Sequence, residues 1–206
     1  MTIDRSKSKV SWVSVSGADL VRQFVEKGSL SGILPAQSAI YFWRLRLKSN
    51  TPPSDGRGLF KHLKRVTELP LGRVDAIRLS RGLYANGFEL GGKGLPPETL
   101  STLESMAFNR LDAKFLTVFL ADLEARIPAL YCGQTGQLSA RIVNHLNSKT
   151  DFGSMVEHDT DLSWDDLYLE YRVVGNASED NEDRKRQALE YLATVMTISA
   201  FTKRAG

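Results

Sequence analysis

The sequence predicts an α+β protein in which a three-stranded antiparallel sheet is flanked by helices and preceded by a mainly helical N-terminal part. Short runs of alternating apolar residues, bounded by turn-forming residues, are typical of strands. Longer segments in which apolar residues recur every third or fourth position are typical of amphipathic helices. In the second half these patterns follow the order strand, strand, helix, strand, helix, which favours an α+β architecture.

The first 112 residues form the N-terminal region of this prediction. A helix is expected over 17–27, because Ser16 and Asp19 resemble a capping box and Gly28 is a typical helix end. The aromatic and alternating run 38–47 predicts a strand. Three further helices are expected over 58–68, 72–85 and 97–108, separated by prolines and glycines.

Residues 113–206 form the second predicted domain. Strands are expected at Phe115–Leu120 and Ala129–Gly133, which would pair as a hairpin, and at Leu167–Val174. Helices are expected over 137–147 and over 183–200, each with an apolar stripe along one face.

The composition is that of an ordinary soluble globular protein. Of the 206 residues 42% are hydrophobic and 25% are charged, which excludes collagen-like, coiled-coil and wholly disordered chains. No apolar run approaches the roughly 18 residues of a membrane span, and the N-terminus lacks an apolar signal core. A single cysteine permits no internal disulfide. These features predict a cytoplasmic protein without a membrane segment.

Charge is divided unevenly along the chain. Residues 1–110 hold 17 basic and 9 acidic side chains, a balance of +8, whereas the rest of the chain holds 10 and 15, a balance of −5. A basic half suggests a polyanionic partner such as DNA, although a solvated surface or a helical cap over the sheet is the alternative. The candidate phosphate contacts lie on the strand at 38–47 and on two successive predicted helices: Arg44, Arg46, Lys61, Lys64, Arg65, Arg73 and Arg78.

The run from Leu130 to Leu146 contains the most informative residue pattern. A strand carries Tyr131, a turn follows Gly133, and the next helix holds Arg141 and His145 one turn apart on one face. An arginine can hold a phosphate through two hydrogen bonds, and histidine or tyrosine can transfer a proton. The combination suits an anionic, oxygen-rich substrate, although a core tyrosine and a solvated helix face would have the same pattern.

This run resembles the GIY-YIG nuclease family. Tyr131-Cys132-Gly133 corresponds to the second half of the family name, Arg141 to its helix arginine, and His145 to a histidine of restriction-type members. Further along, Glu190 fits the family's metal-binding glutamate. The resemblance covers about residues 113–206.

The resemblance implies a metal-dependent DNA endonuclease that hydrolyses phosphodiester bonds and is of restriction type. Glu190 would hold Mg²⁺ or Mn²⁺, and Arg141 would stabilise charge on the phosphoryl oxygens. Tyr131, His145 and Tyr41 would orient or deprotonate the attacking water. DNA is the implied partner. The sequence leaves the oligomeric state open, with a homodimer as one option.

Three features depart from the family pattern. Phe119 occupies the place expected for the tyrosine of the first half of the motif, and Thr202 replaces an asparagine. Glu190 is expected on the face of its helix opposite the apolar stripe. The segment Ala39-Ile40-Tyr41 could supply the missing tyrosine across a gap of about 90 residues. The alternatives are a nucleic-acid-binding or regulatory protein of the same fold without catalysis, and a protein-interaction module.

Overall fold

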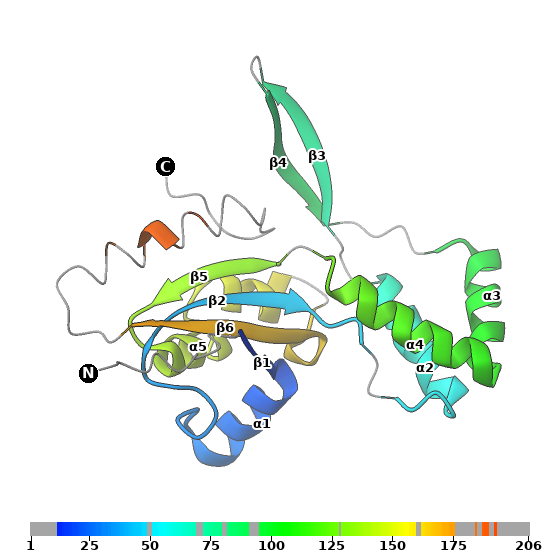
Figure 1. The fold of residues 1–206 in the computed structure, drawn as a ribbon, viewed down its shortest axis with the longest axis horizontal. Coiled ribbons are helices and arrows are strands. Elements are labelled where there is room, and N and C mark those ends of the chain that lie inside the picture. The colour runs from blue at the N-terminus through cyan, green and yellow to red at the C-terminus, as the bar shows by residue number, and fades with distance from the viewer. Residues whose placement is uncertain are drawn as a thin grey trace, which may run out of the picture.

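A four-stranded antiparallel sheet forms the centre of the computed structural model (Figure 1). The structure describes residues 12–48, 51–68, 72–79, 82–90, 95–127, 129–159, 162–175, 184, 187–189 and 192. The sheet order is β1-β6-β2-β5. Its strands are β1 (Val13–Ser16), β2 (Ser38–Leu45), β5 (Tyr131–Thr135) and β6 (Leu167–Gly175). The sheet therefore joins strands from both sides of residue 112.

Helices α1 (Gly17–Lys27) and α5 (Leu138–Leu146) lie beneath the sheet in the view of Figure 1. Helix α6 (Asp151–Ser154) follows α5, and the chain reaches β6 through a π-helical turn, η1 (Met155–Asp159), and a 3₁₀ turn, η2 (Trp164–Asp166). The predicted capping of α1 is confirmed. Ser16 accepts the amide of Asp19, and Gly28 ends the helix with a φ of 64°.

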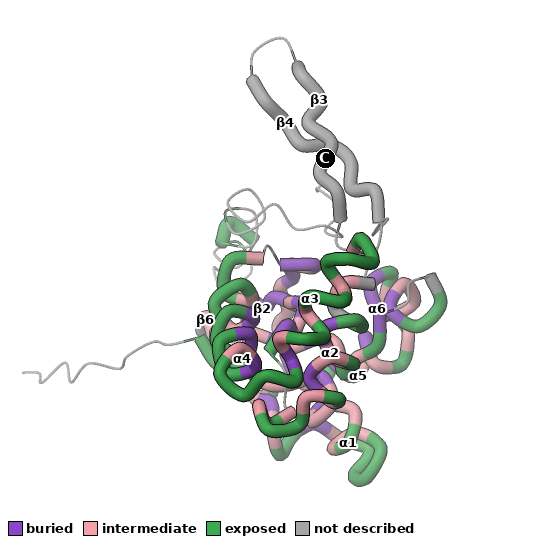
Figure 2. The backbone as a smooth tube through the Cα atoms, turned by 90° about the vertical axis from the view of Figure 1, so that its right-hand side faces the viewer, coloured by how far each residue is buried: buried purple, intermediate pink, exposed green. Residues whose placement is uncertain are grey.

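The central strand β2 supplies the middle of the core. Tyr41 and Trp43 are fully buried and pack with Ile142 of α5, Phe152 of α6 and Leu169 of β6. Alternate residues of β2 face the opposite side of the sheet, where Phe42 forms a smaller apolar cluster with two neighbours, Ala129 and Cys132. All but one of the residues of β2 are buried, and buried residues lie in the interior of the molecule in Figure 2.

Three helices extend the core beyond the sheet: α2 (Gly56–Glu68), α3 (Pro97–Phe108) and α4 (Arg110–Glu124). Leu59 and Leu63 of α2 and Leu116 and Leu120 of α4 belong to the same apolar cluster as Trp43. The predicted helices over 58–68 and 97–108 are therefore confirmed. Among the described residues, no helix has the length and apolarity needed to span a membrane.

The predicted strand Phe115–Leu120 is wrong, because these residues lie in α4. Asn109 caps this helix by accepting the amides of Leu111 and Asp112. Ala113, Leu116 and Leu120, spaced three and four residues apart, are buried on one face. The predicted hairpin with residues 129–133 is therefore also wrong, and β5 pairs with β2 instead.

The predicted helix over 72–85 is likewise wrong. These residues belong to β3 (Gly72–Leu79) and β4 (Gly82–Leu90), which pair as a separate two-stranded antiparallel sheet. A helix through this segment would have placed Gly82 in its interior, at a cost of about 1 kcal/mol relative to alanine. The expected pair of basic helices joined near residue 70 is therefore replaced by α2 and a strand pair.

The predicted strands at 38–47 and 167–174 correspond to β2 and β6, and the helix over 137–147 corresponds to α5. The sheet has four strands rather than three, because β1 adds to the outer edge of β6, from Val13 opposite Tyr171 to Ser16 opposite Tyr168. Most of the predicted helix over 183–200 lies outside the described residues.

Candidate functional site between β2 and α5

The pairing of β2 with β5 brings the two tyrosine segments side by side. Tyr41 lies opposite Gly133, and Trp43 lies opposite Tyr131. After β5 the chain turns into α5, whose first amide, that of Leu138, donates to Gln37 O before β2. The apolar stripe of α5 then packs on the sheet, and this orientation directs Arg141 and His145 toward Tyr41.

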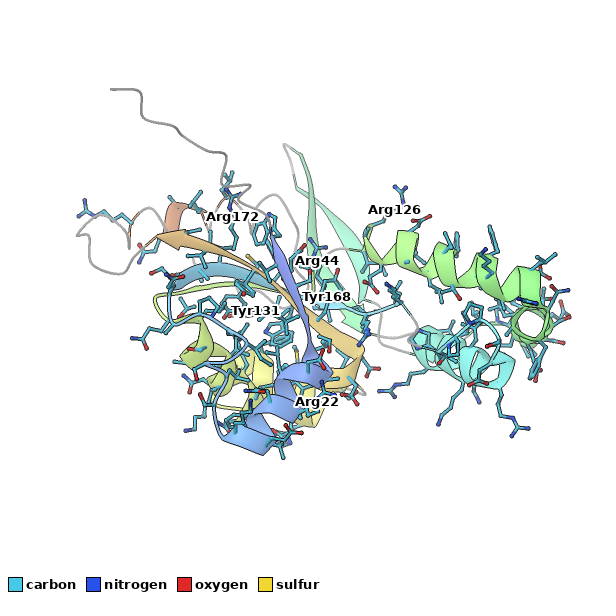
Figure 3. All side chains as sticks on the ribbon, turned by 60° about the horizontal axis from the view of Figure 1, so that its bottom comes forward. Arg22, Arg44, Arg126, Tyr131, Tyr168 and Arg172 are labelled. Atoms are coloured by element: carbon cyan, nitrogen blue, oxygen red, sulfur yellow. The ribbon has the colours of Figure 1, made fainter. Side chains whose placement is uncertain are left out.

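The hydroxyl of Tyr41 connects the two polar residues of α5. Tyr41 Oη lies 2.8 Å from His145 Nε2, and Arg141 Nε donates to Tyr41 Oη over 3.2 Å. The ring of Tyr131, labelled in Figure 3, lies 6.1 Å from that of Tyr41. We call Tyr41, Tyr131, Arg141 and His145 the Tyr41 cluster. Tyr41 and His145 are buried, whereas Tyr131 and Arg141 are partly exposed, so the cluster opens to solvent on one side.

His145 is enclosed by aromatic rings. The ring centroids of Tyr41, Trp43, Tyr131 and Phe152 lie between 5.5 and 6.4 Å from its own. Burial in this environment, with the positive charge of Arg141 adding to it, lowers the pKa of His145 from 6.5 to about 3. The imidazole is therefore neutral at physiological pH and carries one acceptor and one donor nitrogen.

Thr150 holds the second nitrogen of this imidazole. Its Oγ1 lies 2.6 Å from His145 Nδ1 and also accepts the amide of Gly153, which caps α6. One tautomer of His145 satisfies every contact. In it Nδ1–H donates to Thr150, and Tyr41 Oη–H donates to Nε2. In the other tautomer Thr150 donates to Nδ1, Nε2–H donates to Tyr41, and the phenolic hydrogen is directed away from His145. Both tautomers join Tyr41 and Thr150 through His145.

The Tyr41 hydroxyl is a neutral phenol in the resting protein. Burial raises its pKa well above the ordinary value, and Tyr131 adds to this rise, while Arg141 opposes it. Tyr41 can therefore release a proton only if a neighbour accepts it, and His145 Nε2 is in hydrogen-bonding distance.

Neutral, buried His145 should make the protein acid-labile. The unfolded chain binds a proton at a pKa of 6.5, whereas the folded chain binds it only at about 3. The resulting stability is therefore fully present above pH 6.5 and is lost, at about 1.4 kcal/mol per pH unit, as the pH falls toward 3. Urea unfolding between pH 7 and 5 should reveal this slope in the wild type and a smaller one in His145→Gln. His158→Gln, on the exposed η1 turn, should retain the full slope; equal slopes in both variants would contradict the assignment.

Glu190, the predicted metal ligand, and Thr202, which stands where the family has an asparagine, lie outside the described residues. Within the part of the chain that is described, no three His, Cys, Asp or Glu side chains gather as a metal site would require. The described members of the Tyr41 cluster are a guanidinium, two phenols and an imidazole, which do not match the oxygen ligands that Mg²⁺ prefers. A metal at this site would therefore depend on Glu190. Phe119, expected beside Tyr131, lies on the exposed face of α4.

The predicted DNA contacts are spread over several elements. Arg44 donates to Glu170 over 2.8 Å and to Ile127 O. It lies opposite Tyr168 of the neighbouring strand β6 (Figure 3). Arg46 and Lys48 line a shallow hollow of about 290 Å³ together with the acidic residues Glu124 and Glu170.

The basic residues of α2 lie on the surface. Lys61, Lys64 and Arg65 are exposed, and Arg65 pairs with Asp166 over 2.7 Å. Burial acts to raise the pKa of Asp166, but hydrogen bonds from Arg65 and Ser163 hold it below its ordinary value. Arg73 and Arg78 lie on β3 rather than on a helix, and their side chains are outside the description.

Residues that the sequence did not single out complete the site. Thr150 orients His145, and only its position before the short helix α6 could have suggested a capping role. Gly153 lies so close to the end of α5 that an added Cβ would stand 2.2 Å from His145 O.

Comparisons with protein families, with curated proteins and with solved structures found no match to this chain.

Proposed function

We propose that the protein is a metal-dependent DNA endonuclease of GIY-YIG type, which hydrolyses phosphodiester bonds at the Tyr41 cluster. The observation that carries the proposal is the position of Tyr41 Oη, 2.8 Å from His145 Nε2 and 3.2 Å from Arg141 Nε. Three residue types suited to phosphate chemistry thus meet from segments about 100 residues apart.

Strand pairing supports the correspondence with the two halves of the family motif. Tyr41, the last residue of Ala39-Ile40-Tyr41 on β2, lies opposite Gly133, the last residue of Tyr131-Cys132-Gly133 on the neighbouring strand β5. Tyr41, and not Phe119, is therefore the candidate for the first tyrosine. The long sequence gap is no obstacle, since hydrogen-bonded strands need not be adjacent in the chain.

The partly exposed Arg141 would bind the phosphate. Its Nε–H is directed at Tyr41, and the guanidinium carries four further N–H donors, of which some can hold phosphoryl oxygens and stabilise their charge in the transition state. Tyr41 is fully buried, so the attacking water would have to reach its hydroxyl beside the partly exposed Tyr131 and Arg141. Deprotonation of that water through Tyr41 requires His145 Nε2 to take the phenolic proton.

A divalent cation, when bound through Glu190, would polarise the phosphate and stabilise the leaving oxygen. The described residues contribute no carboxylate to the cluster, so the role of the metal derives from the family resemblance alone. Assays with and without Mg²⁺ or Mn²⁺ address this part of the proposal separately.

The alternative is a nucleic-acid-binding or regulatory protein of the same fold without catalysis. The raised pKa of Tyr41 favours it, because a neutral phenol is a weak base and His145, with a pKa of about 3, is a poor proton acceptor. In that case Arg141 and the basic residues of α2 would bind phosphate without hydrolysis.

Plasmid cleavage with Mg²⁺ or Mn²⁺ tests the proposal. The wild type should nick or linearise DNA, and Arg141→Ala should lower the rate by about 10² to 10³, the typical effect of removing one charge-stabilising donor. Arg22→Ala, an exposed arginine on α1, is the matched control and should cleave normally. Salt-sensitive DNA binding without cleavage under either metal would support the alternative. A chain that neither binds nor cleaves DNA would contradict both functions.

A further inference from the structure

The outer face of α4 carries a continuous row of exposed apolar side chains. Leu111, Phe115, Val118 and Phe119 are 79%, 60%, 55% and 50% exposed, and we call these four residues the α4 stripe. The two phenyl rings stack with their centroids 6.0 Å apart. Since a phenylalanine alone offers about 150–250 Å², the stripe exposes apolar surface on the order of several hundred Å². Patches of this size on soluble proteins mark contact surfaces.

The stripe is not needed to hold α4 in place. The opposite face of the helix, with Ala113, Leu116 and Leu120, is buried in the core of the same chain. The spacing from Leu111 to Phe115 to Val118, four and then three residues, gives a narrow seam of the kind that packs against another helix.

Charge along α4 indicates what this seam contacts. Lys114 lies one turn before Val118, and Asp122 lies one turn after it, both on the exposed side of the helix. A second α4 that runs antiparallel, with the two-fold axis at Val118, therefore brings each Lys114 to the Asp122 of the other copy. A parallel partner would instead set lysine beside lysine and aspartate beside aspartate. The antiparallel order also opposes the two helix dipoles favourably.

The apolar residues agree with the same axis. Leu111 of one copy then lies about 3 Å along the helix from the level of Leu123 in the other, and Phe115 of one lies as close to the level of Phe119 in the other. Arg110 of one copy and Arg126 of the other lie at the same level, about 12 Å along the helix from the axis. Solvent and salt screen the repulsion between these two end residues.

From this self-complementarity we propose that the α4 stripe binds a second copy of this chain, with the two α4 helices antiparallel about an axis at Val118. Helices α4 and α5 lie at opposite ends of the molecule in Figures 1 and 3. The pairing therefore leaves both Tyr41 clusters accessible, and it holds whether or not the chain cleaves DNA.

Charge reversal in the full chain tests both the pairing and its direction. Sedimentation over a series of protein concentrations should give a dimer for the wild type, and Lys114→Asp or Asp122→Lys alone should weaken it by about tenfold or more. The double reversal should restore the dimer, and a mixture of the two single variants should form a mixed dimer. Both positions are exposed, and circular dichroism verifies that each variant is folded.

A disulfide across the two-fold axis tests the proposed dimer independently of the charge reversals. Val118→Cys should yield a covalent dimer under mild oxidation, whereas Val25→Cys, on the exposed side of α1, should not. The native Cys132 is buried and does not interfere. A wild type that stays monomeric, a dimer unaffected by both single reversals, or a double reversal that fails to restore it would overturn the proposal.

Discussion

Tyr41→Phe should lower the rate of metal-dependent DNA cleavage by a factor of about 10² to 10⁴ while DNA affinity remains unchanged. The substitution removes one oxygen, the atom through which Arg141 Nε and His145 Nε2 are joined. The phosphate-binding guanidinium remains, so the ground-state complex should form as before. Loss of the two hydrogen bonds of this hydroxyl should cost about 1–3 kcal/mol of folding free energy. This is less than the roughly 5–15 kcal/mol by which native proteins are typically stable, so the variant should remain folded.

Tyr171→Phe is the matched control for this experiment. Tyr171 lies opposite Tyr41 on the neighbouring strand β6 and is 7% exposed, so the same oxygen is removed from the same sheet. The two variants should differ in the rate of single-turnover cleavage. Their DNA affinities, measured by filter binding, should be equal. Equal activity of Tyr41→Phe and the wild type would mean that Tyr41 merely packs the core.

Gly133→Ala should destabilise the protein and disrupt the Tyr41 cluster together. A Cβ at this position would lie 2.6 Å from Tyr41 Oη, 2.7 Å from Tyr41 Cζ and 2.7 Å from Tyr131 Cε1. Tyr41 is fully buried and cannot move away without breaking its contact with His145. Overpacking of this kind costs about 1–3 kcal/mol. We therefore expect a lower urea midpoint and, if the chain is a nuclease, loss of cleavage.

Gly32→Ala serves as the control for the glycine replacement. Its added Cβ would meet only the end of the Gln23 side chain, at 3.2 Å, and this group can move aside. The backbone of Gly133 is not in the left-handed region, which among the described glycines is occupied by Gly28. The effect at position 133 is therefore one of space, and an unaltered midpoint in Gly133→Ala would contradict the packing around Tyr41.

Local chemistry made several elements predictable from the sequence. Ser16, Asp19 and Gly28 specify the ends of α1 by their own hydrogen bonds, and the aromatic run of β2 is typical of a buried strand. Arg141 and His145 share a face of α5 by spacing alone. Their contact with Tyr41 could be stated only as an option, because it depends on strand pairing between distant segments.

The α4 stripe explains why the sequence predicts a strand at Phe115–Leu120, where the structure has a helix. Apolar side chains on both faces of this helix hide its periodicity, and the run Phe115–Leu120 then looks like a strand buried on both sides. The burial of Leu116 and Leu120 alone would have indicated a helix. The exposed apolar residues on the outer face of the helix mask that signal. In residues 72–90 the antiparallel pairing of β3 with β4 replaces the helix that the apolar spacing predicts.

The place of β2 between β5 and β6 has a consequence for how the chain folds. Tyr41 and His145 are 104 residues apart, and β2 joins two strands that come from the far end of the sequence. Such pairing is slow, because a long loop must close before its contacts form. During synthesis β2 emerges before β5 and β6, and it cannot pair with them until both have been made. The Tyr41 cluster should therefore assemble late and in one cooperative step. A fragment limited to residues 113–206 would hold β5 and β6 with nothing between them. Refolding should require addition of the N-terminal fragment in trans.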